Sequence, residues 1–415
     1  MTVADSQTRF MFHRMGSLTT AAREKAWARV PEADALKARA VRARDRVLTD
    51  LSAYLDRLEE AARGNGVTVM RAAGAQEANR QIIETLRKLG ATETLRNHHP
   101  LLDEIKLDDA AKANAVRLTP LHLGDFLAQL TGEHSGHPIW PVGHLTVEAI
   151  SEALQEKWRV PKTYDPDHLT STVRMRLRRL LLRADAAVLG VNFAVADGGV
   201  FALLDNDGHN ASLVSLVRHG ILILSVDQIV ADMADLETLT RVFALSAWGR
   251  SRPAYITHLQ KATPQGVDGP RTLHLILVDN RRSEIIDQGF GEALRCIHCG
   301  ACHTTCPVYQ QIGGAGYAHS PYTGPIGTVL NPLLLTPELG EPQAYLCDGA
   351  GLCAATCPLN IDFSRLHLEH RQRLVNAGRA GDDRRFFALW RRFLGMKRLF
   401  IPYWRRATRP PDEVR

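Results

Sequence analysis

Cysteine is missing from most of this sequence. None precedes Cys296, and all seven lie between Cys296 and Cys357. A secreted scaffold held by disulfides would distribute its cysteines through a small domain, so this distribution excludes that class of protein. An odd number of cysteines confined to one segment favours ligation of a metal or a cluster over disulfide pairing.

Long apolar runs and targeting signals are missing as well. No stretch approaches the roughly 18 uninterrupted apolar residues that predict a membrane-spanning helix. The opening residues, MTVADSQTRF, lack the basic-then-apolar order of a secretory signal. We therefore expect a cytoplasmic protein. The formal net charge of +6 is modest for 415 residues, so the charge alone identifies no partner.

The first two thirds of the chain have the patterns of an α/β protein. Apolar residues recur at three- and four-residue steps up to Gly64, which predicts an N-terminal helical segment over residues 1–64. Short continuous apolar runs, typical of strands covered on both faces, then alternate with helical patterns. These runs cover residues 186–189, 200–204, 221–224 and 273–278. We expect one α/β domain with a largely parallel sheet over residues 65–283.

The composition changes near residue 284. The residues that follow are rich in Cys, Gly and Pro and too irregular to bury a core unaided, so bound cofactors must substitute for apolar burial. We expect an α-helical, ferredoxin-like module over residues 284–370 and a basic, amphipathic helical tail over 371–415. The tail has three interpretations: a helix packed on the module, an anchor at a protein interface, or peripheral contact with anionic lipid at the inner face of the cytoplasmic membrane.

The first cysteine run is a C-x2-C-x2-C-x3-C-P motif. Its two-residue gaps let one tight turn of chain reach three corners of a cubane cluster, while the fourth cysteine, followed by Pro307, ligates a neighbouring cluster. The alternatives are buried structural cysteines or a zinc site, since C-x2-C pairs also bind zinc, but the order of the four cysteines and the trailing proline favour an iron–sulfur cluster. By this crossed arrangement, a first [4Fe-4S] cluster takes Cys296, Cys299, Cys302 and Cys357.

The second run repeats these offsets with one change, because Ala350 stands where the second cysteine belongs. Its cluster receives only Cys306, Cys347 and Cys353. An alanine methyl group cannot bind iron, so we predict a [3Fe-4S] cluster, or a labile [4Fe-4S] cluster whose fourth iron binds water or a carboxylate such as Asp348. The remaining alternative is a vestigial site that binds nothing.

From Gly190 onward the sequence resembles the lactate-utilisation protein B family, which supplies the ferredoxin-bearing subunit of a three-protein L-lactate oxidation system. The matching segments are GVNFAVADG at 190–198, QIV at 228–230, VDGP at 267–270, LVDN at 277–280, CPVY at 306–309, G-G-x-x-Y at 313–317 and Y-x-G-P-I-G at 322–327. The resemblance implies an N-terminal lactate-utilisation (LUD) domain, with a fold like that of the sugar-phosphate isomerase and CoA-transferase group, and a two-cluster ferredoxin module. It also implies a complex with other subunits that passes electrons from lactate oxidation toward the respiratory chain.

The α/β region departs from this family at residues 96–100, which read Arg-Asn-His-His-Pro where the family carries Lys-Ser-Lys-Ser-Met. Several histidines lie here and further on: His98, His99, His134, His137 and His144. They lack one clear ligand spacing on a single helix, which favours surface or structural roles over a metal site. Residues 197–199 read Asp-Gly-Gly and lack the G-x-G-x-x-G order, so we expect a tight strand connection and not a phosphate-binding turn.

Five arginines between Arg174 and Arg183 accompany an apolar helical stripe, and residues 170–172 (Thr-Ser-Thr) are a candidate cap for that helix. Without aromatic interleaving or a reader motif, we expect a solvated or subunit-docking face and no nucleic-acid partner.

No flavin or nicotinamide fingerprint is evident, so we expect no catalytic residues and a non-catalytic electron-transfer subunit. The first hypothesis for its function is electron relay in an L-lactate-oxidising complex. Two alternatives stay open: the same relay in another dehydrogenase complex, and a redox- or iron-sensing protein that uses its incomplete second cluster.

Overall fold

The structure is a computed structural model that describes residues 4–133, 136–379, 389, 391 and 392. The chain divides into two compact units, Met1–His367 and Leu368–Arg415. The first contains both sheets and every cysteine. Most of the tail predicted over residues 371–415 lies outside the described residues, so its three interpretations stay predictions. Among the described residues, no helix combines the length and the apolar character needed to cross a membrane.

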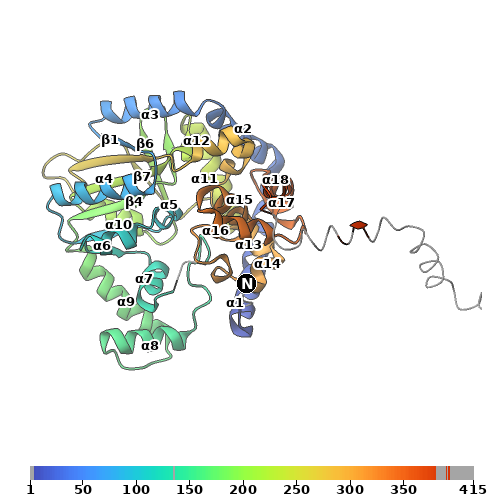
Figure 1. Cartoon of the computed structure of the whole chain (residues 1–415). Coiled ribbons are helices and arrows are strands. Elements are labelled where there is room, and N and C mark those ends of the chain that lie inside the picture. Colours follow the sequence, from blue (N-terminus) through green and yellow to red (C-terminus); the bar gives the residue numbers. More distant parts are fainter. Residues whose placement is uncertain (1–3, 134–135, 380–388, 390, 393–415) are drawn as a thin grey trace, which may run out of the picture. The chain divides into compact units, whose positions relative to one another are not determined.

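The first unit is built around a six-stranded sheet (Figure 1). Its strands lie in the order β1-β10-β7-β4-β2-β3, and every neighbouring pair is parallel. They are β1 (Thr68–Ala72), β2 (Thr94–Arg96), β3 (Leu118–Pro120), β4 (Ala186–Gly190), β7 (His219–Ser225) and β10 (Thr272–Val278). The apolar strands β4 and β7 are central and buried, which confirms the prediction of strands covered on both faces.

Helices cover both faces of this sheet. One face packs against α4 (Ala75–Lys88), α5 (Pro100–Glu104) and α6 (Leu107–Ala113). The other packs against α3 (Leu51–Gly64), α7 (Leu123–Thr131), α8 (Val147–Trp158), α9 (Pro166–Leu181) and α10 (His209–Leu216). Alternate strand residues contribute to the two cores: Val188 of β4 belongs to the core that includes α5, whereas its neighbour Leu189 belongs to the core that includes α9.

The start of α9 differs from the prediction. The helix begins at Pro166, and the side chain of Asp165 caps it by accepting a hydrogen bond from the N–H of Asp167 at 3.0 Å. The proposed cap at residues 170–172 is wrong, because an Asp-Pro pair both caps a helix and presets its first turn. Its arginines are exposed, as expected for a solvated face.

A second sheet of four strands was not predicted. It runs in the order β8-β5-β6-β9, formed by β5 (Phe193–Val195), β6 (Val200–Asp205), β8 (Ile229–Val230) and β9 (Tyr255–Leu259). The prediction that residues 200–204 join the parallel sheet is wrong. Gly198 and Gly199 have φ of 89° and 65°, a left-handed turn that folds β6 back antiparallel to β5. That turn is the tight strand connection expected at residues 197–199.

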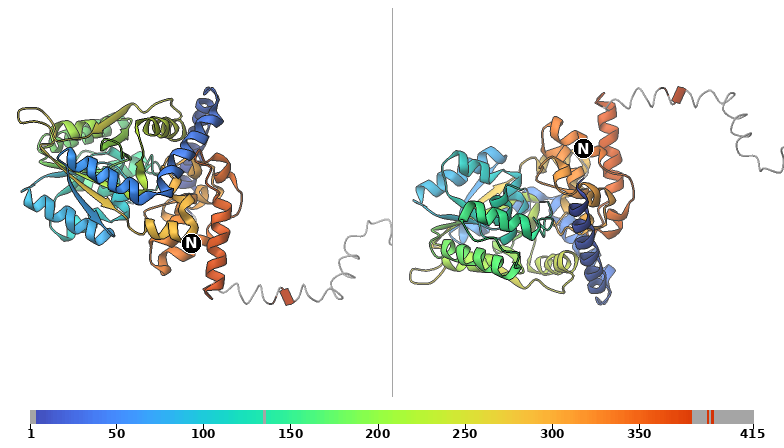
Figure 2. Two further views of the ribbon diagram at one scale, coloured as in Figure 1. Left: turned by 90° about the horizontal axis from the view of Figure 1, so that it is seen from above. Right: turned by 90° about the horizontal axis from the view of Figure 1, so that it is seen from below.

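The remaining helices come from the N-terminal segment, from the connection between β8 and β9, and from residues 282–376. In the order of the chain these helices are α1 (Ser6–Trp27), α2 (Ala33–Thr49), α11 (Met233–Trp248), α12 (Arg282–Ile285), α13 (Ala301–Thr305), α14 (Pro307–Ile312), α15 (Gly324–Leu334), α16 (Pro337–Gly340), α17 (Leu352–Thr356) and α18 (Phe363–Asn376). Short turns of 3-10 or π-helix add η1 (Val226–Gln228), η2 (Ile286–Phe290), η3 (Gly291–Arg295), η4 (Ala315–Tyr317) and η5 (Glu341–Tyr345). Helix α1 lies against α13 and α14, as both views of Figure 2 show.

The carboxyl ends of the parallel strands lie at one edge of the sheet and are followed by polar residues. His98 follows β2, His122 follows β3, Asn192 follows β4, Asp227 follows β7 and Arg282 follows β10. Ligands of open α/β sheets bind at this edge. Here the cysteine segment lies against this edge. Gln228, which follows β7, donates a hydrogen bond to the backbone carbonyl of Cys296 at 3.2 Å.

Candidate functional site

The four cysteines predicted for the first cluster line one cavity of about 50 Å³. They are Cys296 and Cys299 in the loop after η3, Cys302 on α13 and Cys357 at the end of α17. Gly300 makes the turn between Cys299 and Cys302 with φ of 73°. A Cβ atom there would lie 2.7 Å from Cε1 of His137, so both the backbone and the space require glycine.

The other three cysteines, Cys306, Cys347 and Cys353, line a second cavity of about 20 Å³. Ala350 and Asp348 line it too, and Oδ1 of Asp348 accepts a hydrogen bond from the N–H of Ala350 at 3.1 Å. Residues 348–350 are exposed. A carboxylate therefore lies beside the position of the missing thiol, at a corner open to solvent.

Two short helices carry thiols to both cavities. Helix α13 presents Cys302 to the first cavity and ends where Cys306 lines the second; α17 presents Cys353 to the second and ends where Cys357 lines the first. The two thiols of each helix are one turn apart, about 6 Å along the axis, and the helices contact each other. The structure thus brings together the two cysteine sets of the crossed arrangement. Their role as ligands stays a prediction.

The thiols lie in surroundings that disfavour a free thiolate. Burial raises the pKa of Cys353 and of Cys357 to about 12, and it raises the pKa of Cys302 well above its usual value. A buried thiolate needs a compensating cation. Bound iron supplies one, and the loss of the thiol protons is then part of metal binding.

The environment of Arg44 on α2 indicates whether the first cavity suits an anionic cluster. Its side chain is buried, and its Nη2 donates to the carbonyl of Leu294 at 2.5 Å and lies 3.7 Å from Oδ2 of Asp227. Its Nε and Nη1 have no hydrogen-bond partner in the part of the chain that the structure describes. Burial lowers the pKa of Arg44, and the charges of Asp227 and Cys296 oppose that shift. Unpaired cationic donors beside Cys296 suit an anionic acceptor such as iron-bound sulfur, so the residues fit the predicted cluster.

A buried ion network connects the sheet edge to the first cavity. Arg282, which starts α12, forms a two-pronged ion pair with Glu104 of α5, and its Nε lies 3.3 Å from Oδ1 of Asp227. Tyr322 donates to Glu104 at 2.5 Å, and its ring stacks on His298, with centroids 5.2 Å apart. No sequence pattern predicts this network, since 178 residues separate Arg282 from Glu104.

Two of the flagged histidines have structural roles, as expected. His99 caps α5 by accepting from the N–H of Leu101 at 3.3 Å, and His137 stacks on Trp140 with centroids 3.7 Å apart. His134 lies outside the described residues. His98 instead forms hydrogen bonds with Asp125 and stacks on His122, two residues that were not among the predicted site residues. The strand-end positions of the two histidines were the signal that could have found the cluster.

Two cysteine-lined cavities, the first of them beside the carboxyl edge of a parallel sheet, are the features of an iron–sulfur electron-transfer protein with an α/β domain. Family models agree. Residues 55–278 match the LUD domain and residues 292–361 match the 4Fe-4S dicluster domain, which spans all seven cysteines. The chain belongs to the lactate-utilisation protein B family of LUD-domain proteins, which confirms the resemblance and the predicted fold class.

Curated relatives cover most of the chain. The "Uncharacterized electron transport protein YkgF" of Escherichia coli is 33% identical over 82% of this chain and 72% of its own length. "Lactate utilization protein B" of Macrococcus caseolyticus is 34% identical over 80% of this chain and 70% of its own. The protein of the same name from Bacillus subtilis is 33% identical, with shares of 81% and 71%.

Proposed function

We propose that this chain is the electron-transfer subunit of an L-lactate-oxidising complex and relays electrons from lactate oxidation toward the respiratory chain. The observation that carries the proposal is the pair of thiol-lined cavities joined by α13 and α17 in a lactate-utilisation protein B chain. Iron–sulfur clusters bound there supply one-electron transfer. Partner subunits carry out the oxidation of lactate, because the sequence has no evident flavin or nicotinamide fingerprint. We further propose that the complex works in the cytoplasm.

We assign the cysteines as the crossed arrangement requires. The first site, for a [4Fe-4S] cluster, uses Cys296, Cys299, Cys302 and Cys357; the second, for a [3Fe-4S] cluster or a labile [4Fe-4S] cluster, uses Cys306, Cys347 and Cys353. The division into residues 1–64, 65–283, 284–370 and 371–415 belongs to the same proposal. Within it, His98 and Pro138 of the α/β domain line the first site. Gln228 of the same domain and Arg44 of the N-terminal helical segment donate hydrogen bonds to the backbone carbonyls of Cys296 and Leu294.

The crossed assignment predicts opposite effects for two serine variants. Cys357→Ser removes a ligand from the first site although residue 357 belongs to the second run, so we expect the EPR signal of the reduced [4Fe-4S] cluster to be lost or altered. Cys306→Ser belongs to the first run, and we expect it to abolish only the signal of the second site. Each variant is the control for the other. Loss of the signals in the reverse combination would show that each run binds its own cluster.

Growth tests the role in lactate oxidation. In the source organism, with its other L-lactate-oxidising enzymes removed, deletion of the gene should abolish growth on L-lactate and leave growth on pyruvate, the oxidation product, unchanged. Complementation with the natural gene should restore growth, whereas the Cys299→Ala variant should not. Undiminished growth of the deletion strain on L-lactate would reject the proposal. A defect confined to another reduced substrate would favour a relay in a different dehydrogenase complex.

One observation favours the sensing alternative. Residues 348–350 expose the incomplete corner of the second site to solvent, where oxidants and free iron have access. Reversible exchange between three- and four-iron forms, tied to a regulated output in the cell, would support a sensor. Normal growth on L-lactate after deletion would have to accompany it.

A further inference from the structure

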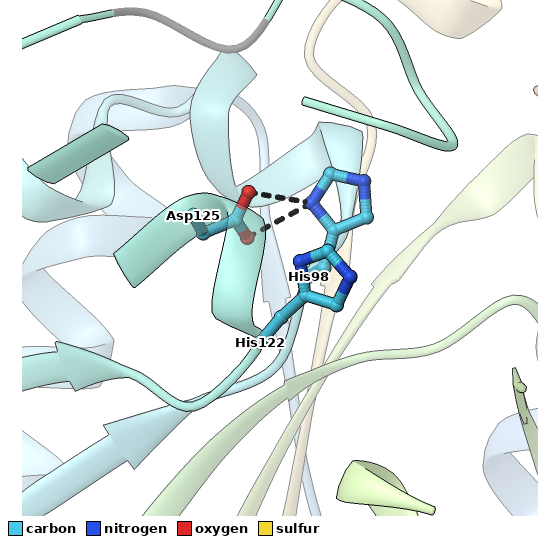
Figure 3. Close-up of side chains that lie close together, drawn as sticks. All are labelled: His98, His122 and Asp125. Carbon is cyan, nitrogen blue, oxygen red and sulfur yellow. Dashed lines mark hydrogen bonds and ion pairs between the residues drawn. The ribbon is translucent and has the colours of Figure 1, made fainter. Parts of the chain in front are cut away.

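A second kind of ligand cluster lies outside the cysteine cavities. We propose that His98, His122 and Asp125 bind a divalent transition-metal ion (Figure 3). One nitrogen of each imidazole and one carboxylate oxygen lie within 4.8 Å of one another. His98 follows β2, His122 follows the neighbouring strand β3 and precedes α7, and Asp125 lies in the first turn of α7. The parallel sheet therefore places the three residues together.

The hydrogen bonds of His98 require a positive charge between it and Asp125. Its Nε2 lies 2.8 Å from the backbone carbonyl of Pro138, which only accepts, so this nitrogen carries a proton. Its Nδ1 lies 2.9 Å and 2.8 Å from the two oxygens of Asp125, and a carboxylate also only accepts. Nδ1 must therefore hold either a second proton or a metal ion. A metal ligand whose other ring nitrogen donates to a backbone carbonyl is a common arrangement.

His122 supplies the third donor. Its Nδ1 is buried and has no hydrogen-bond partner among the described residues. Burial and the adjacent His98 lower the pKa of His122 to about 4, so the ring is neutral, as metal ligation requires. Its Nε2 lies 3.8 Å from Oδ2 of Asp207, which is too far for a hydrogen bond, but the negative charge of that carboxylate favours a proton on this nitrogen. Nδ1 is then the nitrogen with a free lone pair.

Asp125 is also fixed in a position suited to metal binding. The carboxylate is buried, and Nη1 of Arg96 lies 3.2 Å from its Oδ2. Burial opposes its charge, but His98 and Arg96 lower the pKa of Asp125 well below the usual value. Asp125 is thus ionised and fixed in orientation before any metal arrives.

The site opens into a cavity of about 140 Å³ at the carboxyl edge of the sheet. His98 and His122 line it, together with polar groups such as Asn192, Asp207 and His209. His98, Pro100, Pro138, Ile297 and His298 line both this cavity and the first cysteine cavity. A metal ion here would keep coordination positions open toward a polar pocket, with one layer of side chains between that pocket and Cys296.

The donor set selects the kind of ion. Two imidazoles and one carboxylate with open positions suit Zn²⁺ or Fe²⁺, whereas Mg²⁺ and Ca²⁺ prefer all-oxygen ligands. The absence of thiols from this set distinguishes it from the cysteine sites. The proposal does not depend on the role in lactate oxidation.

Zinc is the probe, because X-ray absorption by zinc identifies the atoms that are bound to it. Full-length protein with its clusters loaded anaerobically is equilibrated with Zn²⁺ in the presence of a chelating competitor, and metal content is measured with zinc X-ray absorption. We expect about one zinc per chain beyond the cluster iron, with nitrogen and oxygen neighbours at about 2.0–2.1 Å, imidazole scattering and no sulfur. His122→Gln should weaken zinc binding at least about tenfold, while His168→Gln, an exposed histidine on α9, should not change it.

Three results would overturn the proposal: no zinc retained by the natural protein, zinc with sulfur neighbours, or equal binding by His122→Gln. The cluster absorbance per chain shows whether the variant is folded. The absorption spectrum of the natural protein decides the donor set even where the variant loses its clusters. Growth on L-lactate does not enter this test, so the metal site and the proposed function fail independently.

Discussion

Ala350→Cys should convert the second site into a complete four-thiolate site. The new thiol would stand at the corner where Ala350 and Asp348 now line the cavity. We expect the three-iron EPR signal of the oxidised protein to disappear and the iron content to rise from about seven to about eight per chain. EPR of the oxidised and the reduced protein, with iron and sulfide analysis, measures both changes. The effect is large because one side chain determines the number of irons.

Ala355→Cys is the matched control. This residue lies on α17 and is exposed, so it adds a thiol outside the corner and should leave the signal and the iron content unchanged. Natural protein with about eight irons and no three-iron signal would contradict the prediction, because its fourth iron would already be held without a cysteine. Asp348→Ala would then test the carboxylate as the ligand, with loss of one iron as the expected result.

Arg282→Met should strongly destabilise the protein. The substitution leaves two buried carboxylates, Glu104 and Asp227, without their shared cation. Removal of one partner from a buried ion pair costs about 3–5 kcal/mol, because the remaining charge stays desolvated. Urea unfolding of the cluster-loaded protein under anaerobic conditions, followed by circular dichroism and by cluster absorbance, should show an earlier transition in both signals.

Arg281→Met provides the comparison at the adjacent position. Arg281 pairs with Glu284 three residues on, at 2.8 Å, and both side chains are well exposed. Its loss should change the free energy of unfolding by less than about 1 kcal/mol. Equal effects of the two variants would show that the network around Arg282 contributes no more than a surface pair.

The sequence predicts the parts of this protein that depend on local pattern. The apolar runs that became β4, β7 and β10 are continuous, and such runs identify strands buried on both faces. The cysteine spacing likewise determines which thiols one turn of chain can bring to one cavity, and the structure groups them accordingly. Local spacing accounts for the strands and for the grouping of Cys296, Cys299 and Cys302. The addition of Cys357 from the second run came from the crossed pattern of two-cluster ferredoxins.

The parts that escaped prediction depend on the order of the strands. Arg282 meets Glu104 because β10 and α5 lie at the same sheet edge, and Asp125 meets His98 because β2 and β3 are neighbours. A single sequence does not reveal strand order, so these polar residues had no visible partners. The second sheet was missed for the same reason, since β6 has the composition of a central parallel strand.

The sharing of α13 and α17 between the two cysteine sites bears on how the protein matures. Each helix is five residues long, too short to be stable alone in water. The first inorganic core to arrive therefore orders both helices and meets the entropic cost of positioning thiols for the second core. We expect assembly in the cell to be cooperative. Most chains should then hold either no inorganic cluster or both, and few should hold only one.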